Sequence, residues 1–119
     1  MKPKHVVLIE DNPDILEILE VLIREAGYRV TAMESVVSLE DLLTMEADVF
    51  VLDEQLPMVS GHIICIYLRS KPITAKIPVM LISAHPRLGN YAELCSADTW
   101  IPKPFDALFF LDELKKLLV

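Results

Sequence analysis

Short apolar runs alternate along the chain with segments whose apolar residues recur at helical spacing. The runs cover residues 5–9, 28–33, 49–52, 79–82 and 99–101, and each has the length of a β-strand. The first run has no polar alternation, which is typical of a strand covered on both faces of its sheet. Strands and helices in strict alternation are typical of βαβ units, so the pattern predicts a parallel sheet.

The segments between the runs predict five helices. The clearest follows Asn12, a favourable N-cap residue, with Pro13 at the first helical position, and it ends before Gly27. Three further helices are predicted over residues 36–45, 62–70 and 105–118, where leucine, isoleucine and phenylalanine recur at helical spacing. The remaining helix falls in a segment with weaker signals.

That segment lies between residues 84 and 95. Pro86 and Gly89 disfavour a helix that starts early in it. Asn90, followed three residues later by Glu93, resembles a capping box. We therefore predict a short helix that begins at Tyr91.

Together these elements predict an α/β fold of the doubly wound type. Right-handed crossovers would place helices on both faces of a five-stranded parallel sheet. The 119 residues fit one domain, residues 1–119, because domains typically contain about 100 to 150 residues.

Composition narrows the classes of partner. Eighteen acidic and eleven basic residues give a net charge of −7, which disfavours direct binding to nucleic acid or to an anionic membrane surface. The apolar runs are too short for a membrane-spanning helix, and the N-terminal one is too short for a secretory signal. We therefore expect a cytoplasmic protein without membrane contact.

The two cysteines carry little functional signal. Cys65 and Cys95 are thirty residues apart in apolar stretches, so buried free thiols are expected. His62 could share a helix face with Cys65, but two ligands alone are weak evidence for a metal site.

Polar residues follow four of the five predicted strands. Glu10 and Asp11 follow the first strand, Asp53 the third, Ser83 the fourth and Lys103 the fifth. Doubly wound folds bind ligands at the carboxyl ends of their strands. We therefore expect three carboxylates, a hydroxyl and an ammonium group to converge at one edge of the sheet.

Three neighbouring carboxylates would repel one another by on the order of 10 kcal/mol at an effective dielectric constant near 20. Either one acid is protonated or a divalent cation completes the site, and the oxygen ligands suit Mg²⁺ or Mn²⁺. Without a histidine or cysteine base, the site suits phosphoryl transfer better than acyl transfer. Asp53 is then the expected nucleophile, with Glu10 and Asp11 as metal ligands and Lys103 and Ser83 as stabilisers of phosphoryl charge.

In this order and spacing, the sequence motifs resemble the receiver domain of two-component response regulators over nearly the whole chain. The motifs are Ile9-Glu10-Asp11-Asn12-Pro13-Asp14, Asp53-Glu54-Gln55-Leu56-Pro57 with Gly61, Ser83-Ala84, Ala97-Asp98 and Lys103-Pro104-Phe105. The resemblance implies a flavodoxin-like sheet with strand order 2-1-3-4-5 and, in this chain, a shortened fourth helix. Within this family, the chain is expected to be similar to the chemotaxis regulators.

The resemblance also implies a chemistry. Asp53 would accept a phosphoryl group from a phosphohistidine of a sensor histidine kinase or phosphotransfer protein. Mg²⁺ would be bound by Asp11, Asp53 and the backbone carbonyl of Gln55, with Glu10 acting through water. The protein would be a signalling switch that slowly dephosphorylates itself, rather than a metabolic enzyme.

The same resemblance implies how the state of the site is read. Ser83 would move towards the phosphoryl oxygens and Lys103 would pair with them, across a cis bond to Pro104. Trp100 occupies the place of the switch aromatic residue, where its bulk is expected to restrict inward packing. Trp100 and Phe109 are candidates for a contact with a downstream target, a separate output domain or a second copy of the chain.

The chain departs from the family pattern in three places. The step from Ser83 to Lys103 is shorter than usual, Trp100 is larger than the usual residue, and Ser96 stands where glycine is common. These departures leave an alternative open: a degenerate receiver that acts as a non-phosphorylated docking module.

Overall fold

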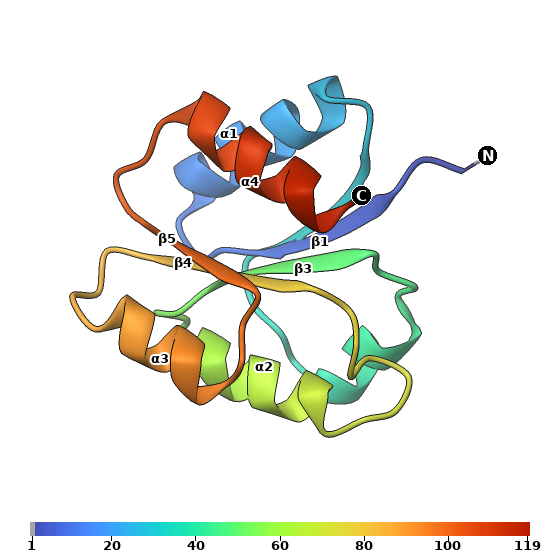
Figure 1. Cartoon of the computed structure of the whole chain (residues 1–119), viewed down its shortest axis with the longest axis vertical. Helices are drawn as coiled ribbons and strands as arrows, with labels where there is room; N and C mark the ends of the chain where they lie inside the picture. The colour runs from blue at the N-terminus through green and yellow to red at the C-terminus, as the bar shows by residue number, and fades with distance from the viewer. Residues whose placement is uncertain (1) are drawn as a thin grey trace.

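The computed structural model describes residues 2–119 and places a five-stranded parallel sheet between two helical layers (Figure 1). The strands are β1 (His5–Ile9), β2 (Arg29–Met33), β3 (Val49–Asp53), β4 (Val79–Ser83) and β5 (Thr99–Pro102). Their order is β2-β1-β3-β4-β5, and every neighbouring pair is parallel. The predicted flavodoxin-like topology is therefore confirmed.

Burial explains the apolar runs of the sequence. Every residue of the three inner strands β1, β3 and β4 is buried, whereas the edge strands β2 and β5 are partly exposed. In the register of the sheet, Ile9 lies beside Leu52 and Asp53 beside Ile82. The first residues beyond β1 are therefore level with the end of β3.

The helices form two layers. One contains α1 (Pro13–Glu25) and α4 (Ala107–Leu117), and the other contains η1 (Leu39–Thr44), α2 (Gly61–Arg69) and α3 (Leu88–Leu94) (Figure 1). Each layer closes its own apolar core against the sheet. The predicted start of the first helix is confirmed, because the Asn12 side chain accepts hydrogen bonds from the backbone N–H groups of Asp14 and Ile15.

The second predicted helix, over residues 36–45, is wrong in type and length. The structure has a six-residue 3₁₀ helix there, and its N-cap Ser38 makes no side-chain hydrogen bond. Leu39 and Leu42 are three residues apart, and this spacing places them above one another on a 3₁₀ helix as well as on one face of an α-helix. The leucine pattern could not separate the two structures.

The predicted start of the fourth helical segment is also wrong. Helix α3 begins at Leu88, and Asn90 lies inside it, so it is not a cap. Leu88 and Ala92, one helical turn apart, are both buried, and their burial outweighs the low helix propensity of Gly89. The seven residues of α3 agree with the predicted shortening.

At the amino end of the sheet, Arg69 ties three segments together. Its guanidinium donates to the backbone carbonyls of Ala75, Ile77 and Ser96 and to the carboxylate of Asp98. Oδ1 of Asp98 lies 2.6 Å from Nη2 of Arg69 and also accepts from the backbone N–H of Val79. The last residue of α2 is thereby joined to the starts of β4 and β5.

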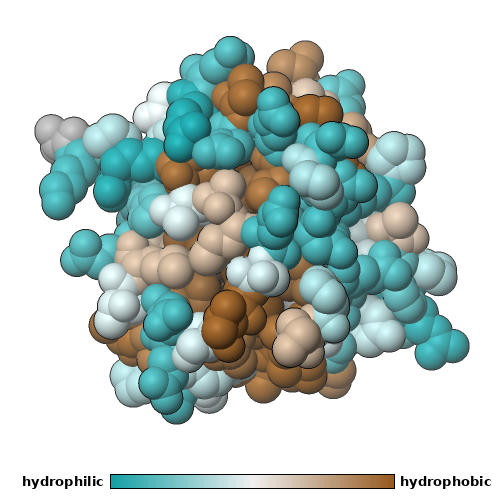
Figure 2. Space-filling view, turned by 180° about the vertical axis from the view of Figure 1, so that it is seen from behind, coloured by the Kyte–Doolittle hydropathy of each residue, from teal (hydrophilic) through white to brown (hydrophobic). Residues whose placement is uncertain are grey.

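The cysteines are buried free thiols, as predicted, and the Sγ of Cys65 lies 3.4 Å from the carbonyl oxygen of Cys95, to which it donates. Seen from behind, apolar side chains gather at the top and bottom of the surface among polar ones (Figure 2). Both helical layers do expose apolar residues, such as Ile18 on α1 and Ile63 on α2. Across residues 2–119, no helix is both long enough and apolar enough to cross a membrane.

Candidate functional site

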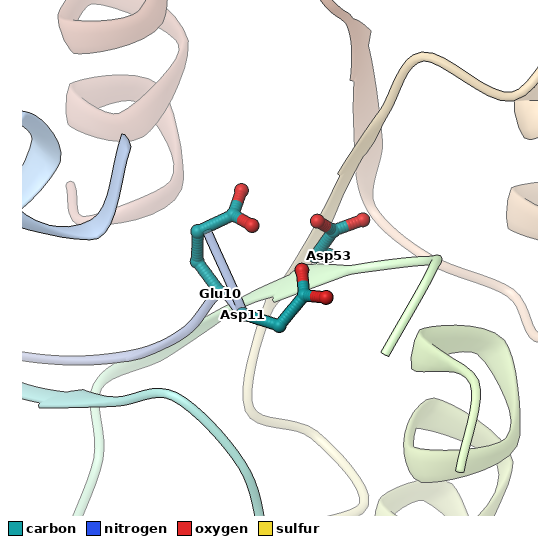
Figure 3. Close-up of side chains that lie close together, drawn as sticks. All are labelled: Glu10, Asp11 and Asp53. Carbon is teal, nitrogen blue, oxygen red and sulfur yellow. The ribbon is translucent and has the colours of Figure 1, made fainter. Parts of the chain in front are cut away.

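Three carboxylates meet at the carboxyl end of the sheet. Glu10 and Asp11 directly follow β1, and Asp53 is the last residue of the neighbouring strand β3. Each offers an oxygen atom, and these atoms all lie within 4.8 Å of one another (Figure 3). Glu10 and Asp53 are buried, whereas Asp11 is exposed. The cluster is therefore a pocket with two acids at its base and one at its mouth.

Lys103 joins this pocket from the loop after β5. Its Nζ lies 2.5 Å from Oε1 of Glu10 and 2.9 Å from Oδ2 of Asp53. Burial alone would lower the pKa of the Lys103 ammonium, but the hydrogen bonds to Glu10 and Asp53 outweigh burial, and the pKa is raised. The lysine therefore stays charged between the two buried acids. The peptide bond from Lys103 to Pro104 is cis, as the resemblance implied.

Glu10 is the carboxylate whose ionisation is most disfavoured by the pocket. The pKa of Glu10 is raised to about 7, chiefly by burial and then by the interaction with Asp53, while Lys103 and the backbone N–H of Asn12 act in the opposite direction. Its two carboxylate oxygens already accept from Lys103 and from Asn12, the latter at 3.0 Å. Without a cation, a proton on Glu10 relieves the repulsion.

The donor set suits a hard divalent cation. All three groups are carboxylates, and the exposed position of Asp11 gives access from solvent. Oδ1 of Asp53 accepts from the backbone N–H of Gln55 at 2.8 Å, and Oδ2 accepts from Lys103. The carboxylate oxygens of both buried acids, Glu10 and Asp53, are therefore engaged in hydrogen bonds, whereas Asp11 is the acid exposed to solvent.

Ser83 closes the opposite side of the pocket. Its Oγ donates to Oε1 of Gln55 at 2.9 Å and accepts from the backbone N–H of His85 at 3.1 Å. Sequence reasoning assigned only the backbone carbonyl of Gln55 and missed its side chain, because no local pattern signals a contact across 28 residues. The hydroxyl is thus held by the loop that follows Asp53.

Trp100 lies outside the pocket, half-exposed on β5, with its ring against Gly89 of α3. A β-carbon at position 89 would lie 3.0 Å from Cζ2 of Trp100, so the glycine makes room for the indole. Trp100 also borders an open hollow of about 890 Å³ beside α3, to which Phe109 does not contribute. A shared contact patch of Trp100 and Phe109 remains a prediction.

Three polar residues near the pocket were not identified as a group from the sequence. Nδ1 of His62 lies 2.5 Å from Oε2 of Glu54, and the His62 ring stacks on Tyr91 of α3. Within residues 2–119, the only cluster of three or more potential metal ligands is the acidic pocket, and it includes neither His62 nor Cys65. His62 is instead hydrogen-bonded, through its backbone N–H and its ring, to the buried carboxylate of Glu54.

Comparison with known proteins agrees with this geometry. A family model described as the response regulator receiver domain matches residues 6–115. The DNA-binding dual master transcriptional regulator RpaA of Synechocystis sp. is 29% identical over 117 residues, which cover 96% of this chain and 48% of RpaA. The response regulator SaeR of Staphylococcus aureus is 28% identical over 116 residues, covering 96% of this chain and 50% of SaeR. The chain thus spans about half the length of these two relatives.

A solved structure extends the likeness to three dimensions. The signal receiver domain of a signal transduction histidine kinase from Syntrophus aciditrophicus superposes with a TM-score of 0.84. It is 26% identical, and the match covers 97% of this chain and 89% of that one. The fold therefore agrees with that of this receiver domain over almost the full length of the chain.

Proposed function

The chain belongs to the family of response regulator receiver domains, and we propose that it is a phosphoacceptor switch in which Asp53 is phosphorylated by a sensor histidine kinase or phosphotransfer protein. The observation that carries the proposal is the position of Lys103 between Glu10 and Asp53. An ammonium group there offsets part of the negative charge at rest and faces Oδ2 of Asp53, the proposed phosphoacceptor residue. Asp11 adds a third acid at the mouth of the pocket.

Receiver domains generally bind a divalent metal ion at an acidic pocket, and the carboxylates of this pocket fit such an ion. We propose that Asp11, Asp53 and the backbone carbonyl of Gln55 hold Mg²⁺ or Mn²⁺, with Glu10 acting through water. The ion would supply positive charge beside the equatorial oxygens of the phosphoryl group.

In the proposed reaction, a carboxylate oxygen of Asp53 attacks phosphorus in line with the donor nitrogen. The new P–O bond forms as the P–N bond of the phosphohistidine breaks, and the electron pair of that bond remains on the imidazole. Lys103 already lies 2.9 Å from Oδ2 of Asp53, so its charge is in place as the phosphoryl group arrives. Ser83 would leave Gln55 to donate to a phosphoryl oxygen.

The donor protein needs a surface beside the pocket, and an apolar groove of about 350 Å³ adjoins Lys103. It lies between α1 and the loop before α4 and is lined by Ile15, Ile18, Leu22, Pro104 and Phe105, among others. Ile18 is 60% exposed and adjoins the other apolar side chains of this groove, so the apolar surface is continuous rather than a single exposed residue. We propose that the phosphodonor docks there.

RpaA is described as DNA-binding, but the net charge of −7 disfavours contact of this domain itself with DNA. We propose that the state of Ser83 is read by a protein target, a separate output domain or a second copy, at the side of α3 and Trp100. The hollow beside Trp100 is lined in part by Ala84 and His85, the two residues that follow Ser83.

The chemistry is tested by incubation with Mg²⁺ and a small acyl phosphate as donor. The wild-type domain should gain the mass of one phosphoryl group, and hydroxylamine should release it. Asp53→Asn should gain none, whereas the control Asp48→Asn, at the opposite end of β3, should be labelled like the wild type. Equal labelling of wild type and Asp53→Asn would exclude Asp53 as the phosphoacceptor, and labelling of neither would favour the docking module.

A further inference from the structure

Glu54 is a buried carboxylate that the proposed reaction does not use. It directly follows Asp53 and is 4% exposed, yet it contacts neither Lys103 nor Ser83. Its side chain is hydrogen-bonded to His62 in the first turn of α2, in the helical layer that also contains η1 and α3. A buried carboxylate is costly unless its oxygens are hydrogen-bonded, so these contacts need a structural or functional reason.

Three hydrogen bonds accepted by Glu54 join the two ends of the loop over residues 55–60. Its backbone carbonyl accepts from the N–H of Gly61 at 3.0 Å. Its side chain accepts from the backbone N–H of His62 at 2.7 Å and from the His62 ring at 2.5 Å. Glu54, just before the loop, is therefore hydrogen-bonded to both Gly61 and His62, just after it.

The loop closed in this way carries Gln55. The N–H of Gln55 donates to Asp53, and its side-chain oxygen accepts from Ser83. Few other contacts restrain the loop, since Met58 is 82% exposed and only Leu56 and Val59 pack partly against the core. The position of Gln55 therefore depends on the closure that Glu54 provides.

His62 is itself braced from α3. Its ring stacks on Tyr91 with centroids 4.6 Å apart and an interplanar angle of 15°, and Tyr91 meets His85 edge-on at 5.1 Å. The backbone N–H of His85 donates to Ser83, whose hydroxyl donates to Gln55. The contacts thus form a closed circuit around the two loops that border the pocket.

We infer that Glu54, held by His62, is a positioning residue that keeps the Gln55 loop closed, so that Gln55 is in place for the metal ion and for Ser83 before either moves. This inference rests on the proposed function, because it concerns the same pocket. Unlike a merely stabilising ion pair, a positioning pair affects metal affinity and loop opening beyond its effect on global stability.

The experiment compares Glu54→Leu, Glu54→Gln and His62→Leu with a matched control, Thr74→Val. Thr74 is a buried residue whose hydroxyl donates to the carbonyl of Leu68 at 2.7 Å, and neither residue belongs to the pocket. Two quantities are measured: the Mg²⁺ dissociation constant and the hydrogen exchange of amides 55–62 in the metal-free domain.

Glu54→Leu should weaken Mg²⁺ binding about tenfold, as removal of a residue behind a ligand typically does, and should accelerate exchange in the loop. Glu54→Gln, which keeps an acceptor for the His62 N–H, should recover most of both. His62→Leu should fall between them. Thr74→Val should lower the unfolding midpoint while leaving Mg²⁺ affinity and loop exchange unchanged.

The inference is wrong if Glu54→Leu and Thr74→Val behave alike in Mg²⁺ affinity and loop exchange. If Glu54→Leu does not fold, the comparison of Glu54→Gln and His62→Leu with Thr74→Val decides in the same way. Neither readout requires phosphorylation. A wild-type domain that takes no phosphoryl group would therefore contradict the proposed function alone, while exchange in the loop still tests the role of Glu54.

Discussion

The α-carbon of Gly61 packs against the backbone carbonyl of Asp53 so closely that a β-carbon at position 61 would overlap the carbonyl oxygen. The same β-carbon would lie 3.0 Å from Cα of Glu54. All of these atoms belong to the backbone, so no side chain can turn aside to make room. The requirement for glycine arises from this close approach and not from backbone dihedral angles, since φ at Gly61 is not positive.

Gly61→Ala should therefore destabilise the domain by about 1 to 3 kcal/mol, the usual cost of overpacking, and weaken Mg²⁺ binding by displacing Asp53. Urea unfolding with and without Mg²⁺ measures both effects. Ser60→Ala, one residue earlier and without a side-chain cap to lose, should change neither. Wild-type stability in Gly61→Ala would show that the strand end shifts freely.

The stability of the metal-free domain should depend on pH through Glu10. Its pKa is about 7 in the folded chain and near 4.5 when unfolded, so the folded state binds the proton more tightly. The resulting stabilisation is fully present below about pH 4.5 and is lost as pH rises through 7, by on the order of 3 kcal/mol. Urea unfolding in chelator across this range measures it.

Glu10→Gln provides the control for that titration, because it removes the ionising group and keeps a similar shape. The slope of unfolding free energy against pH between 4.5 and 7 should flatten in this variant. Added Mg²⁺ should reverse the trend in the wild type, since the cation competes with the proton. An unchanged slope in Glu10→Gln would assign the pH dependence to another group.

Lys103→Met should destabilise the metal-free domain most at alkaline pH. The change leaves two buried carboxylates, of Glu10 and Asp53, without their cation, which typically costs about 3 kcal/mol. Protonation of Glu10, whose pKa is already raised to about 7 with Lys103 in place, relieves this cost, so the loss should shrink as pH falls through 7. Lys116→Met, which breaks an exposed pair with Glu113, should show no such pH dependence.

Gly89→Ala should alter the environment of Trp100 more than the stability of the domain. The new β-carbon would lie 3.0 Å from the indole ring, which must shift, while the gain in helix propensity of about 1 kcal/mol offsets the lost contact. Trp100 is the single tryptophan, so its fluorescence maximum reports the shift directly. Glu93→Ala, in the same helix, should leave the maximum unchanged.

The sequence was most informative where burial and topology act together. The apolar strand runs predicted the parallel sheet because strands covered on both faces need no polar alternation. Once the sheet was parallel, its carboxyl end brought Glu10, Asp11, Asp53 and Lys103 into one pocket. Predicting that these residues meet required only the order of the strands in the sheet, and the resemblance to receiver domains supplied that order.

The errors arose where local signals compete with tertiary contacts. Because Leu88 is buried, α3 begins at this residue and includes Gly89, earlier than the sequence predicted. The leucine spacing in η1 is compatible with a 3₁₀ helix as well as with an α-helix. The bond from Glu54 to His62 joins residues eight apart across a loop, and no periodicity marks such a pair. Side-chain networks of this kind depend on loop conformation, which the sequence pattern does not determine.

The hydrogen bonds of Arg69 give the two ends of α3 unequal freedom. Its guanidinium grips the carbonyl of Ser96, just beyond the C-terminal end of α3, whereas the N-terminal end follows the loop in which His85 contacts Ser83. A rearrangement that starts at Ser83 would therefore reach α3 at its N-terminal end, through His85, while Arg69 holds the segment just beyond its C-terminal end. Any displacement of α3 would then be larger beside the pocket than at the amino end of the sheet.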